Sequence, residues 1–286
     1  MDTSLAAYVQ LTAMRKRLRN VQILFITLLV IASFMLFVSY AFSAFMYAIA
    51  LAFYYFYLRP HLKEYGLRFA AERTRFGLCP SLAHYRDTPK GLWSEDDIAS
   101  LKLLPIRRER QGLVCRHGFS GEVDQMQVQG SEVTFHYALH NTKGNPTYRF
   151  LSGMIVAVRR QQPGSGDWLL LQNDLVEEPA LSEFLQDAGY VPVEDDLGIL
   201  SDTCRLYSCD TDFAIGKALV KRINALLTVA PSTGAIRFTP QETIVFLSKR
   251  FFAYTIGTRI VITEEMLRSN PLPEFESILA LAAYHD

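Results

Sequence analysis

The longest apolar stretch in the sequence covers residues 20–58 and predicts two helices that cross a membrane. It holds no charged residue, no histidine, no glycine and no proline. A single helix of this length would extend about 58 Å, whereas the apolar core of a bilayer is about 30 Å thick. Two spans joined by a tight turn fit that thickness. We place the turn near residues 38–43, where Ser39, Tyr40 and Ser43 are the most polar side chains.

Basic residues at both ends of this stretch predict its orientation. Lysine and arginine accumulate on the cytoplasmic side of membrane proteins, so both ends are expected in the cytoplasm, which only an even number of spans allows. Tyr54, Tyr55 and Tyr57 are expected to form an aromatic belt where the second span returns to the interface. The basic side chains that we expect to face lipid are Arg15, Lys16, Arg17, Arg19, Arg59 and Lys63.

Ala44, Ala48 and Ala52 form a stripe of small side chains on the second span. Small residues spaced by four allow a neighbouring helix to approach closely. Packing against the first span is the favoured interpretation, and contact between two copies of the chain is the alternative. The spans contain no charged residue that would mark a path for ions or protons, which argues against a transporter.

Outside the membrane, helical patterns are expected before and directly after the spans. Residues 1–19 form a basic interfacial segment, and residues 59–110 form a juxtamembrane helical linker. A helix over 61–76 continues the second span until Gly77 and Pro80 end it. A second helix begins after Ser94, which precedes three acidic residues typical of a helix start.

Residues 111–286 are predicted to form a cytoplasmic α+β domain. Apolar and polar residues alternate over 132–139, which indicates a strand with one buried face. Further strands are expected in a succession typical of an antiparallel meander and its continuation: 147–159, 168–172, 205–208, 235–239, 243–247 and 251–256. Helices are expected over 180–188, from residue 210 or 211 to 229, and over 273–284. Strands followed by helices in this order suggest an antiparallel sheet with packed helices.

Charge and cysteine content narrow the function classes. The formal net charge is zero, and no basic stretch outside the membrane flanks is long enough to follow a nucleic-acid backbone, so we expect no nucleic-acid partner. The four cysteines, at positions 79, 115, 204 and 209, match no disulfide framework. They are expected to be reduced thiols in a reducing compartment.

The order of several segments resembles a bacterial family known as domain of unknown function 3137 (DUF3137). The segments are "SEDDIASLKLLP", "GFSGEVDQMQVQGSEVTFHYAL", "RFLSGMIVAV", "LYSCDTDFAIGKAL" and "AIRFTPQETIVFLS". The resemblance covers roughly residues 62–286. It implies a protein of the bacterial inner membrane, with a LemA-like protein as a possible neighbour, and it brings no catalytic residues.

Few side chains suggest chemistry. Cys115, His117, Cys204 and Cys209 could together hold zinc, but they lack the tight Cys-x-x-Cys spacing of structural zinc sites, so buried or half-buried thiols are the favoured interpretation. His136 and His140 could bind a metal or act as a base, although exposed histidines near a turn are more common. The paired acids of the loops could raise one another's pKa for acid–base chemistry, but are more often only solvated: Glu177, Glu178, Asp195 and Asp196.

Five arginines could form a basic patch that docks on lipid, although a solvated surface is favoured: Arg107, Arg108, Arg110, Arg159 and Arg160. Taken together, the sequence favours a membrane-anchored cytoplasmic binding or scaffold module without a cofactor. Its expected partners are the lipid bilayer and either a protein or further copies of the chain. An enzyme that acts on lipid or protein at the membrane surface and an accessory subunit of a membrane complex are the alternatives.

Overall fold

The structure is a computed structural model. It describes residues 3–78, 82–104, 113–140, 146–160, 166–173, 175–176, 178–193, 202–210, 215–249 and 256–284, and only the backbone of 136–140, 146–149 and 178–179. The chain forms two compact units. The hairpin unit comprises Met1–Pro80 and Phe252–Pro271, and the sheet unit comprises Ser81–Phe251 and Leu272–Asp286.

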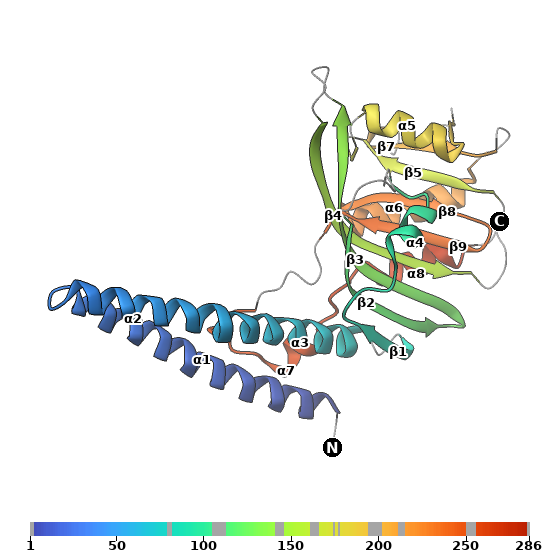
Figure 1. The fold of residues 1–286 in the computed structure, drawn as a ribbon. Helices are drawn as coiled ribbons and strands as arrows, with labels where there is room; N and C mark the ends of the chain where they lie inside the picture. The colour runs from blue at the N-terminus through green and yellow to red at the C-terminus, as the bar shows by residue number, and fades with distance from the viewer. Residues whose placement is uncertain are drawn as a thin grey trace. The chain divides into compact units, whose positions relative to one another are not determined.

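The hairpin unit is built on two long antiparallel helical segments (Figure 1). Helix α1 runs over Thr3–Met35. After a short turn, the chain continues without interruption through α2 (Tyr40–Phe53), the π-helix η1 (Tyr54–Leu58) and α3 (Arg59–Leu78). The short helix α7 (Glu264–Arg268) returns to this unit from late in the sequence and contacts both α1 and α3.

Heptad spacing explains how the two long segments pack. The buried residues of α1 include Ser4, Leu11, Leu18 and Ala32, which lie at multiples of seven residues from one another. The returning segment buries residues at intervals of seven, eight and seven: Ser43, Ala50, Leu58 and Tyr65. The interval of eight spans η1, because a π-turn takes one more residue than an α-turn. The extra residue therefore keeps the same face of the helix directed at α1.

The sheet unit contains one antiparallel sheet in the strand order β1-β2-β3-β4-β9-β8-β5-β7-β6. The first half is a meander of the short strand β1 (Ala83–Thr88) and three long strands, β2 (Val114–Val123), β3 (Met126–His140) and β4 (Pro146–Arg159). The other half consists of shorter strands, namely β5 (Trp168–Gln172), β6 (Val191–Pro192), β7 (Cys204–Ser208), β8 (Thr233–Phe238) and β9 (Glu242–Leu247). Strand β9 pairs with both β4 and β8 and so joins the two halves.

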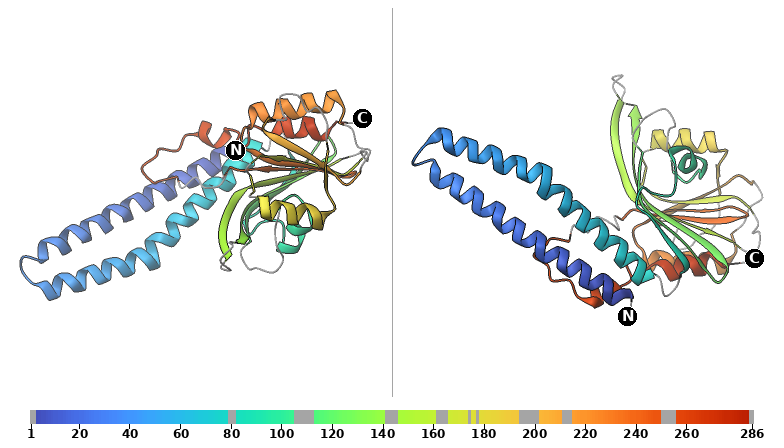
Figure 2. Two further views of the ribbon diagram at one scale, coloured as in Figure 1. Left: turned by 90° about the horizontal axis from the view of Figure 1, so that it is seen from above. Right: turned by 60° about the horizontal axis from the view of Figure 1, so that its bottom comes forward.

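Helices cover both faces of this sheet (Figure 2). Helices α6 (Lys217–Val229) and α8 (Phe275–Ala282), orange and red, pack on one face. Helices α4 (Glu95–Ser100) and α5 (Glu178–Ala188), teal and yellow, lie over the other. Side chains alternate between the faces of a sheet, and the central strands β4 and β9 bury apolar residues on both faces.

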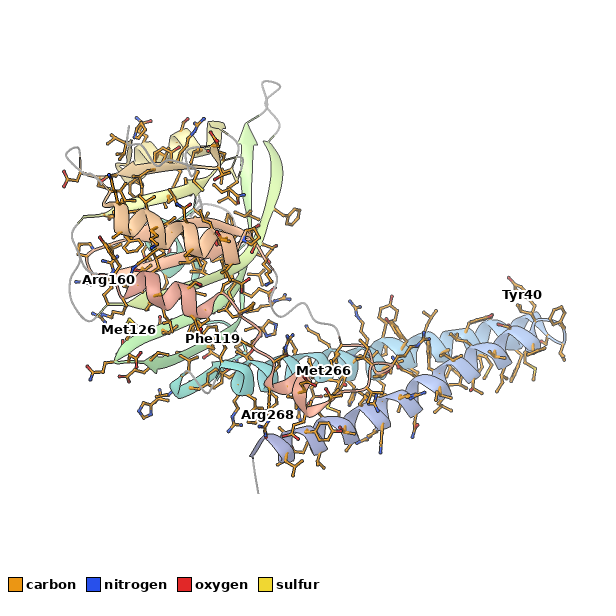
Figure 3. All side chains as sticks on the ribbon, turned by 180° about the vertical axis from the view of Figure 1, so that it is seen from behind. Tyr40, Phe119, Met126, Arg160, Met266 and Arg268 are labelled. Carbon is orange, nitrogen blue, oxygen red and sulfur yellow. The ribbon has the colours of Figure 1, made fainter. Side chains whose placement is uncertain are left out.

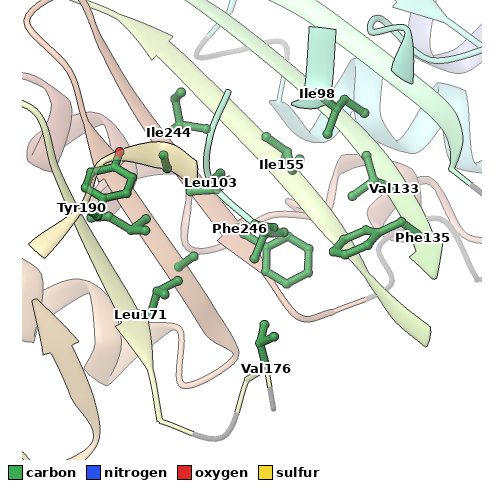
Figure 4. Close-up of a cluster of buried hydrophobic side chains, with 14 of the residues drawn as sticks. Ile98, Leu103, Val133, Phe135, Ile155, Leu171, Val176, Tyr190, Ile244 and Phe246 are labelled. Carbon is green, nitrogen blue, oxygen red and sulfur yellow. The ribbon is translucent and has the colours of Figure 1, made fainter. Parts of the chain in front are cut away.

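The core under α4 and α5 gathers residues from distant parts of the chain (Figure 4). Ile98 and Leu103 come from α4 and the turn after it, whereas Phe135 and Ile155 come from the long meander strands. Phe246 on β9 is fully buried among them. Alternating apolar residues from six strands thus form one continuous core beneath the two helices.

The observed fold confirms the predicted α+β class, with an antiparallel sheet and two long apolar helices at the N-terminal end. The strands expected over 132–139, 147–159, 168–172, 205–208, 235–239 and 243–247 all form. Ser94 caps α4 in a capping box with Asp97, as its sequence indicates. Gly189, with a φ of 77°, lies just after the end of α5.

Several boundaries differ from the prediction. Residues 3–19 do not form a separate interfacial helix, because α1 is continuous to Met35. The turn lies at 36–38, and Ser39 caps α2, so most of the range 38–43 is already helical. Helix α6 starts at Lys217 with Gly216 as its cap, later than residue 210 or 211. Residues 251–255 of the expected last strand lie outside the described residues.

The division into units also differs from the expected domains. Residues 59–78 belong to the hairpin unit as α3, and β1 and α4 belong to the sheet unit, so 59–110 is not one linker. Phe252–Pro271, expected within the cytoplasmic domain, belongs to the hairpin unit. Contacts between residues more than two hundred positions apart create this arrangement, and sequence periodicity gives no sign of them.

Candidate functional site

The tip of the hairpin exposes most of its apolar side chains. In the most apolar windows of the two long helices, only 11% and 17% of the residues are buried. Phe34 on α1 is 69% exposed and Phe37 in the turn is 88% exposed. A core helix of a water-soluble domain would bury such residues, because each large apolar side chain gains about 1.5–3 kcal/mol by leaving water. Both helices are long and apolar enough to cross a membrane.

Polar contacts hold the two helices together within this apolar surface. The hydroxyl of Ser43 donates to the carbonyl of Ala32 at 2.7 Å, and both residues are fully buried. Ser33 and Tyr47 share a second hydrogen bond across the hairpin, also at 2.7 Å. Small residues at the crossing allow this close approach, as they do in membrane helix pairs.

The alanine stripe does not take part in this contact. Ala44, Ala48 and Ala52 are all exposed, while Ser43 and Ala50 are the buried residues of α2. The interpretation that the stripe packs against the first span is therefore wrong. The stripe lies on the outer surface of α2, where contact between copies of the chain stays a prediction.

The basic flank is mostly exposed, with one exception. Arg15 is only 8% exposed, and its Nη1 donates to the carbonyl of Ile260 at 2.9 Å. It therefore anchors another part of the chain. The expectation that Arg15 faces lipid is wrong. The other predicted residues, Lys16, Arg17, Arg19, Arg59 and Lys63, are exposed.

Below its apolar tip, the hairpin unit forms a stalk. Here residues 256–268, which we call the late segment, pack on α1 and α3. Leu11 and Leu18 of α1 meet Tyr65 and Phe69 of α3. The late segment adds three buried residues to this cluster, Ile256, Ile262 and Leu267. Figure 3 shows Met266 and Arg268 beside the helices, at the end opposite to Tyr40. Burial raises the pKa of Tyr65 to about 12, and its hydroxyl has no hydrogen-bond partner among the described residues.

A groove of about 490 Å³ lies along the stalk, lined by residues of α1, η1 and α3. Charged and polar groups of both signs line it, among them Arg17, His61, Glu64 and Arg68. Arg68 pairs with Glu64 at 2.8 Å, and His61 contacts the backbone carbonyl of Tyr57 at 2.7 Å. The groove thus contains mixed charges, of which Glu64 and Arg68 form an ion pair.

In the sheet unit, the densest polar contacts surround Asp167, just before β5. Arg237 on β8 binds this carboxylate through two nitrogens, Nε to Oδ1 at 3.0 Å and Nη2 to Oδ2 at 2.6 Å. Tyr190 donates its hydroxyl to Oδ1 at 3.0 Å, and Arg237 also donates to the carbonyl of Leu101. The side chain of Arg237 is 9% exposed. A bidentate pair of this kind fixes the loop before β5 against β8.

The thiol and the phenol near this ion pair are not activated. Burial and the charge of Asp167 raise the pKa of Cys209 above its ordinary value. Burial also raises the pKa of Tyr190. Since the thiolate is the nucleophilic form of cysteine, a raised pKa lowers the reactivity of Cys209 near neutral pH without abolishing it. The cluster is suited to holding the fold.

The candidate zinc ligands lie apart in the strand order. Cys115 is on β2, where His117 lies at an irregular position with a φ of 49°. Cys204 is buried on β7, and six strand steps separate β7 from β2. Cys209 is exposed just after β7. In the described part of the chain, no three histidine, cysteine or acidic side chains gather as a metal site.

The remaining candidates divide between described and undescribed residues. Arg160 stacks on Phe238 with its guanidinium 4.1 Å from the ring centroid and donates to Thr243 at 3.1 Å, so it packs on the sheet. Arg159 is exposed at the end of β4. The other candidates lie outside the described residues or side chains: Cys79, Arg107, Arg108, Arg110, His136, His140, Glu177, Glu178, Asp195 and Asp196.

Sequence reasoning missed two features of functional interest. The bidentate pair of Asp167 and Arg237 joins residues seventy positions apart, and nothing in either local sequence signals it. The packing of the late segment on the stalk was equally hidden. Its one local sign is the turn sequence "IGTRIVIT", in which apolar residues flank a glycine and an arginine.

Comparisons with known proteins give little further guidance. No protein-family model matches the chain, and no curated protein matches it. A crystal structure of the mycobacterial trehalose monomycolate transport factor A, TtfA, aligns with 74% of this chain and 95% of its own, at 13% identity and a TM-score of 0.38. A likeness of this strength carries no argument about function.

Proposed function

We propose that this protein is a two-span anchor of the bacterial inner membrane that holds a binding or scaffold domain in the cytoplasm and acts through protein–protein contacts. The apolar surface at the tip of the hairpin is the observation that carries the proposal. A bilayer is the surrounding that accepts such a surface without cost.

The flanks support the proposed orientation. Phe25 and Tyr54 lie side by side, with ring centroids 5.6 Å apart. Phe25 is five residues after the start of the apolar stretch and Tyr54 is four before its end, so both ends lie at nearly the same level. Exposed cations follow at that level on both helices, including Arg19 and Arg59. The positive-inside rule then assigns both ends of the hairpin to the cytoplasm.

The engaged polar groups of the sheet unit favour binding over catalysis. Asp167 and Arg237 satisfy each other, and the nearby thiol has a raised pKa. A catalytic group needs a free lone pair or an accessible charge in its working state. The bacterial source and a LemA-like partner are carried over from the resemblance to DUF3137.

Affinity capture of the tagged full chain from its own membranes in mild detergent, followed by mass spectrometry, tests the proposal. The matched control is a chimera in which an unrelated two-span hairpin of equal length replaces residues 20–58. A defined partner captured with both proteins would support a cytoplasmic docking surface. Recovery of the full chain alone, as a monomer, would contradict the scaffold function.

A further inference from the structure

An exposed apolar turn projects from the stalk. The backbone N–H of Ile260 donates to the carbonyl of Gly257 at 3.0 Å and closes the turn. Ile256 before it and Ile262 after it are buried in the stalk cluster. Between these two anchors, Ile260 is 48% exposed and Val261 is 62% exposed. The fold thus fixes the base of the turn and leaves the side chains of Ile260 and Val261 exposed.

Contacts to α1 set the level of this turn along the hairpin. The hydroxyl of Thr258 hydrogen-bonds the side-chain oxygen of Gln22, which lies just inside the apolar stretch 20–58. The guanidinium of Arg15, just outside the stretch, donates to the carbonyl of Ile260 at 2.9 Å. The turn therefore lies where the apolar surface begins. The interfacial layer of a bilayer extends about 5–8 Å outward from that boundary.

The charges around the turn match the headgroups of a membrane. Arg259 is exposed at its tip, and the turn sequence contains no acidic residue. Arg17 and Arg19 are exposed on α1 near the same level. Each basic residue near an anionic surface contributes about 1 kcal/mol of attraction. Apolar side chains beside cations are typical of segments that lie in the interface.

We propose that the turn 257–261 is a third membrane attachment, in which Ile260 and Val261 enter the interfacial layer and Arg259 pairs with anionic lipid phosphates. This inference rests on the proposed span of the hairpin, because the span places a bilayer at that level. The turn would then link the late segment of the chain, and with it α7 on the stalk, to the lipid surface.

Tryptophan quenching in vesicles tests this attachment in the full chain. Three single variants, Val261→Trp, Glu265→Trp and Val30→Trp, are reconstituted in phosphatidylethanolamine–phosphatidylglycerol vesicles. Each is measured with and without a mixture of lipids brominated near the top and near the end of their acyl chains, so that both the boundary and the centre of the bilayer contain the quencher. All three positions are exposed. Glu265 on α7 is the matched control, because α7 lies toward the start of α1, where Arg268 donates to Ser4 at 3.0 Å. Emission of the parent chain is subtracted from each variant.

Each outcome separates the two proposals. We expect the added emission of Val261→Trp to be blue-shifted and largely lost with brominated lipid, while that of Glu265→Trp stays unchanged and that of Val30→Trp is lost. Loss at Val30→Trp without loss at Val261→Trp would overturn the third attachment and leave the span standing. No loss at Val30→Trp would overturn the span and, with it, the attachment.

Discussion

The sheet unit buries most of its large apolar side chains, whereas the tip of the hairpin unit exposes them. Phe246 in the sheet unit is completely buried, whereas Phe34 in the hairpin unit is 69% exposed. The sheet unit covers apolar residues on both faces with helices. The tip of the hairpin buries few residues, such as Ala32, Ser43 and Ala50, which face the other helix. The sheet unit therefore supplies its own apolar surroundings, whereas the tip of the hairpin lacks them within the described chain and, in the proposed function, obtains them from a bilayer.

The same contrast holds for polar groups. The sheet unit pairs its buried guanidinium, Arg237, with a carboxylate and a backbone carbonyl. The hairpin tip satisfies its buried hydroxyl, Ser43, with the backbone carbonyl of Ala32. The sheet unit uses charges from neighbouring strands that are far apart in the sequence, and the hairpin tip uses neutral groups that cost little in an apolar medium.

Removing one phenyl ring from each unit gives the largest expected difference. Phe246→Ala should lower the free energy of unfolding by about 3–5 kcal/mol, because it leaves a cavity in the core. Phe34→Ala should change it by about 0.5 kcal/mol or less, as at other exposed positions. Thermal unfolding in mild detergent, followed by circular dichroism, measures both, because this signal reports the helices of the hairpin unit as well as the sheet unit. Similar losses for the two variants would contradict the contrast.

Removing one carboxylate from each unit gives a smaller difference. Asp167→Asn should cost about 2–3 kcal/mol, since it leaves the buried Arg237 without its counter-charge. Glu64→Gln, in the exposed pair with Arg68, should cost about 0.5 kcal/mol. The same unfolding measurement compares them. The double variant Asp167→Asn with Arg237→Met should recover part of the loss, and no difference between the two single variants would refute this role of the ion pair.

Removing one hydroxyl from the hairpin should have the smallest effect. Ser43→Ala should weaken the contact with α1 by about 0.6 kcal/mol, the mean for hydrogen bonds between membrane helices. Hydrogen exchange of α1 and α2 in vesicles, read by mass spectrometry, should accelerate about threefold. Ala48→Ser, on the exposed face of α2, is the control and should leave exchange unchanged. An equal acceleration in both variants would mean that Ser43 plays no special part.

Local patterns predicted most of the elements. Alternation over 132–139 found the centre of β3, and the acids after Ser94 found the start of α4. The length of the apolar stretch required a hairpin, and the structure places its turn within three residues of the predicted range. These features depend on neighbouring residues, which is why the sequence alone could reveal them.

Features that depend on distant residues were missed. Thr258 meets Gln22, and Arg268 meets Ser4, across almost the whole chain. The π-helix at 54–58 adds one residue that keeps the buried positions before and after it facing α1, and only the packed structure reveals this role. The Asp167–Arg237 pair likewise needs the strand order that brings β5 beside β8. The resemblance to DUF3137 and the role of the alanine stripe in assembly stay predictions.

Labelling of the turn in intact cells tests the central claim most directly. A membrane-impermeant maleimide is applied to the parent chain, which has the exposed thiol Cys209, and to the variant Val38→Cys, whose position in the turn is 80% exposed. We expect Val38→Cys to be labelled before the inner membrane is permeabilised and Cys209 to be labelled only afterwards. Labelling of Val38→Cys only after permeabilisation, or of Cys209 before it, would contradict a hairpin that crosses the membrane with both ends in the cytoplasm.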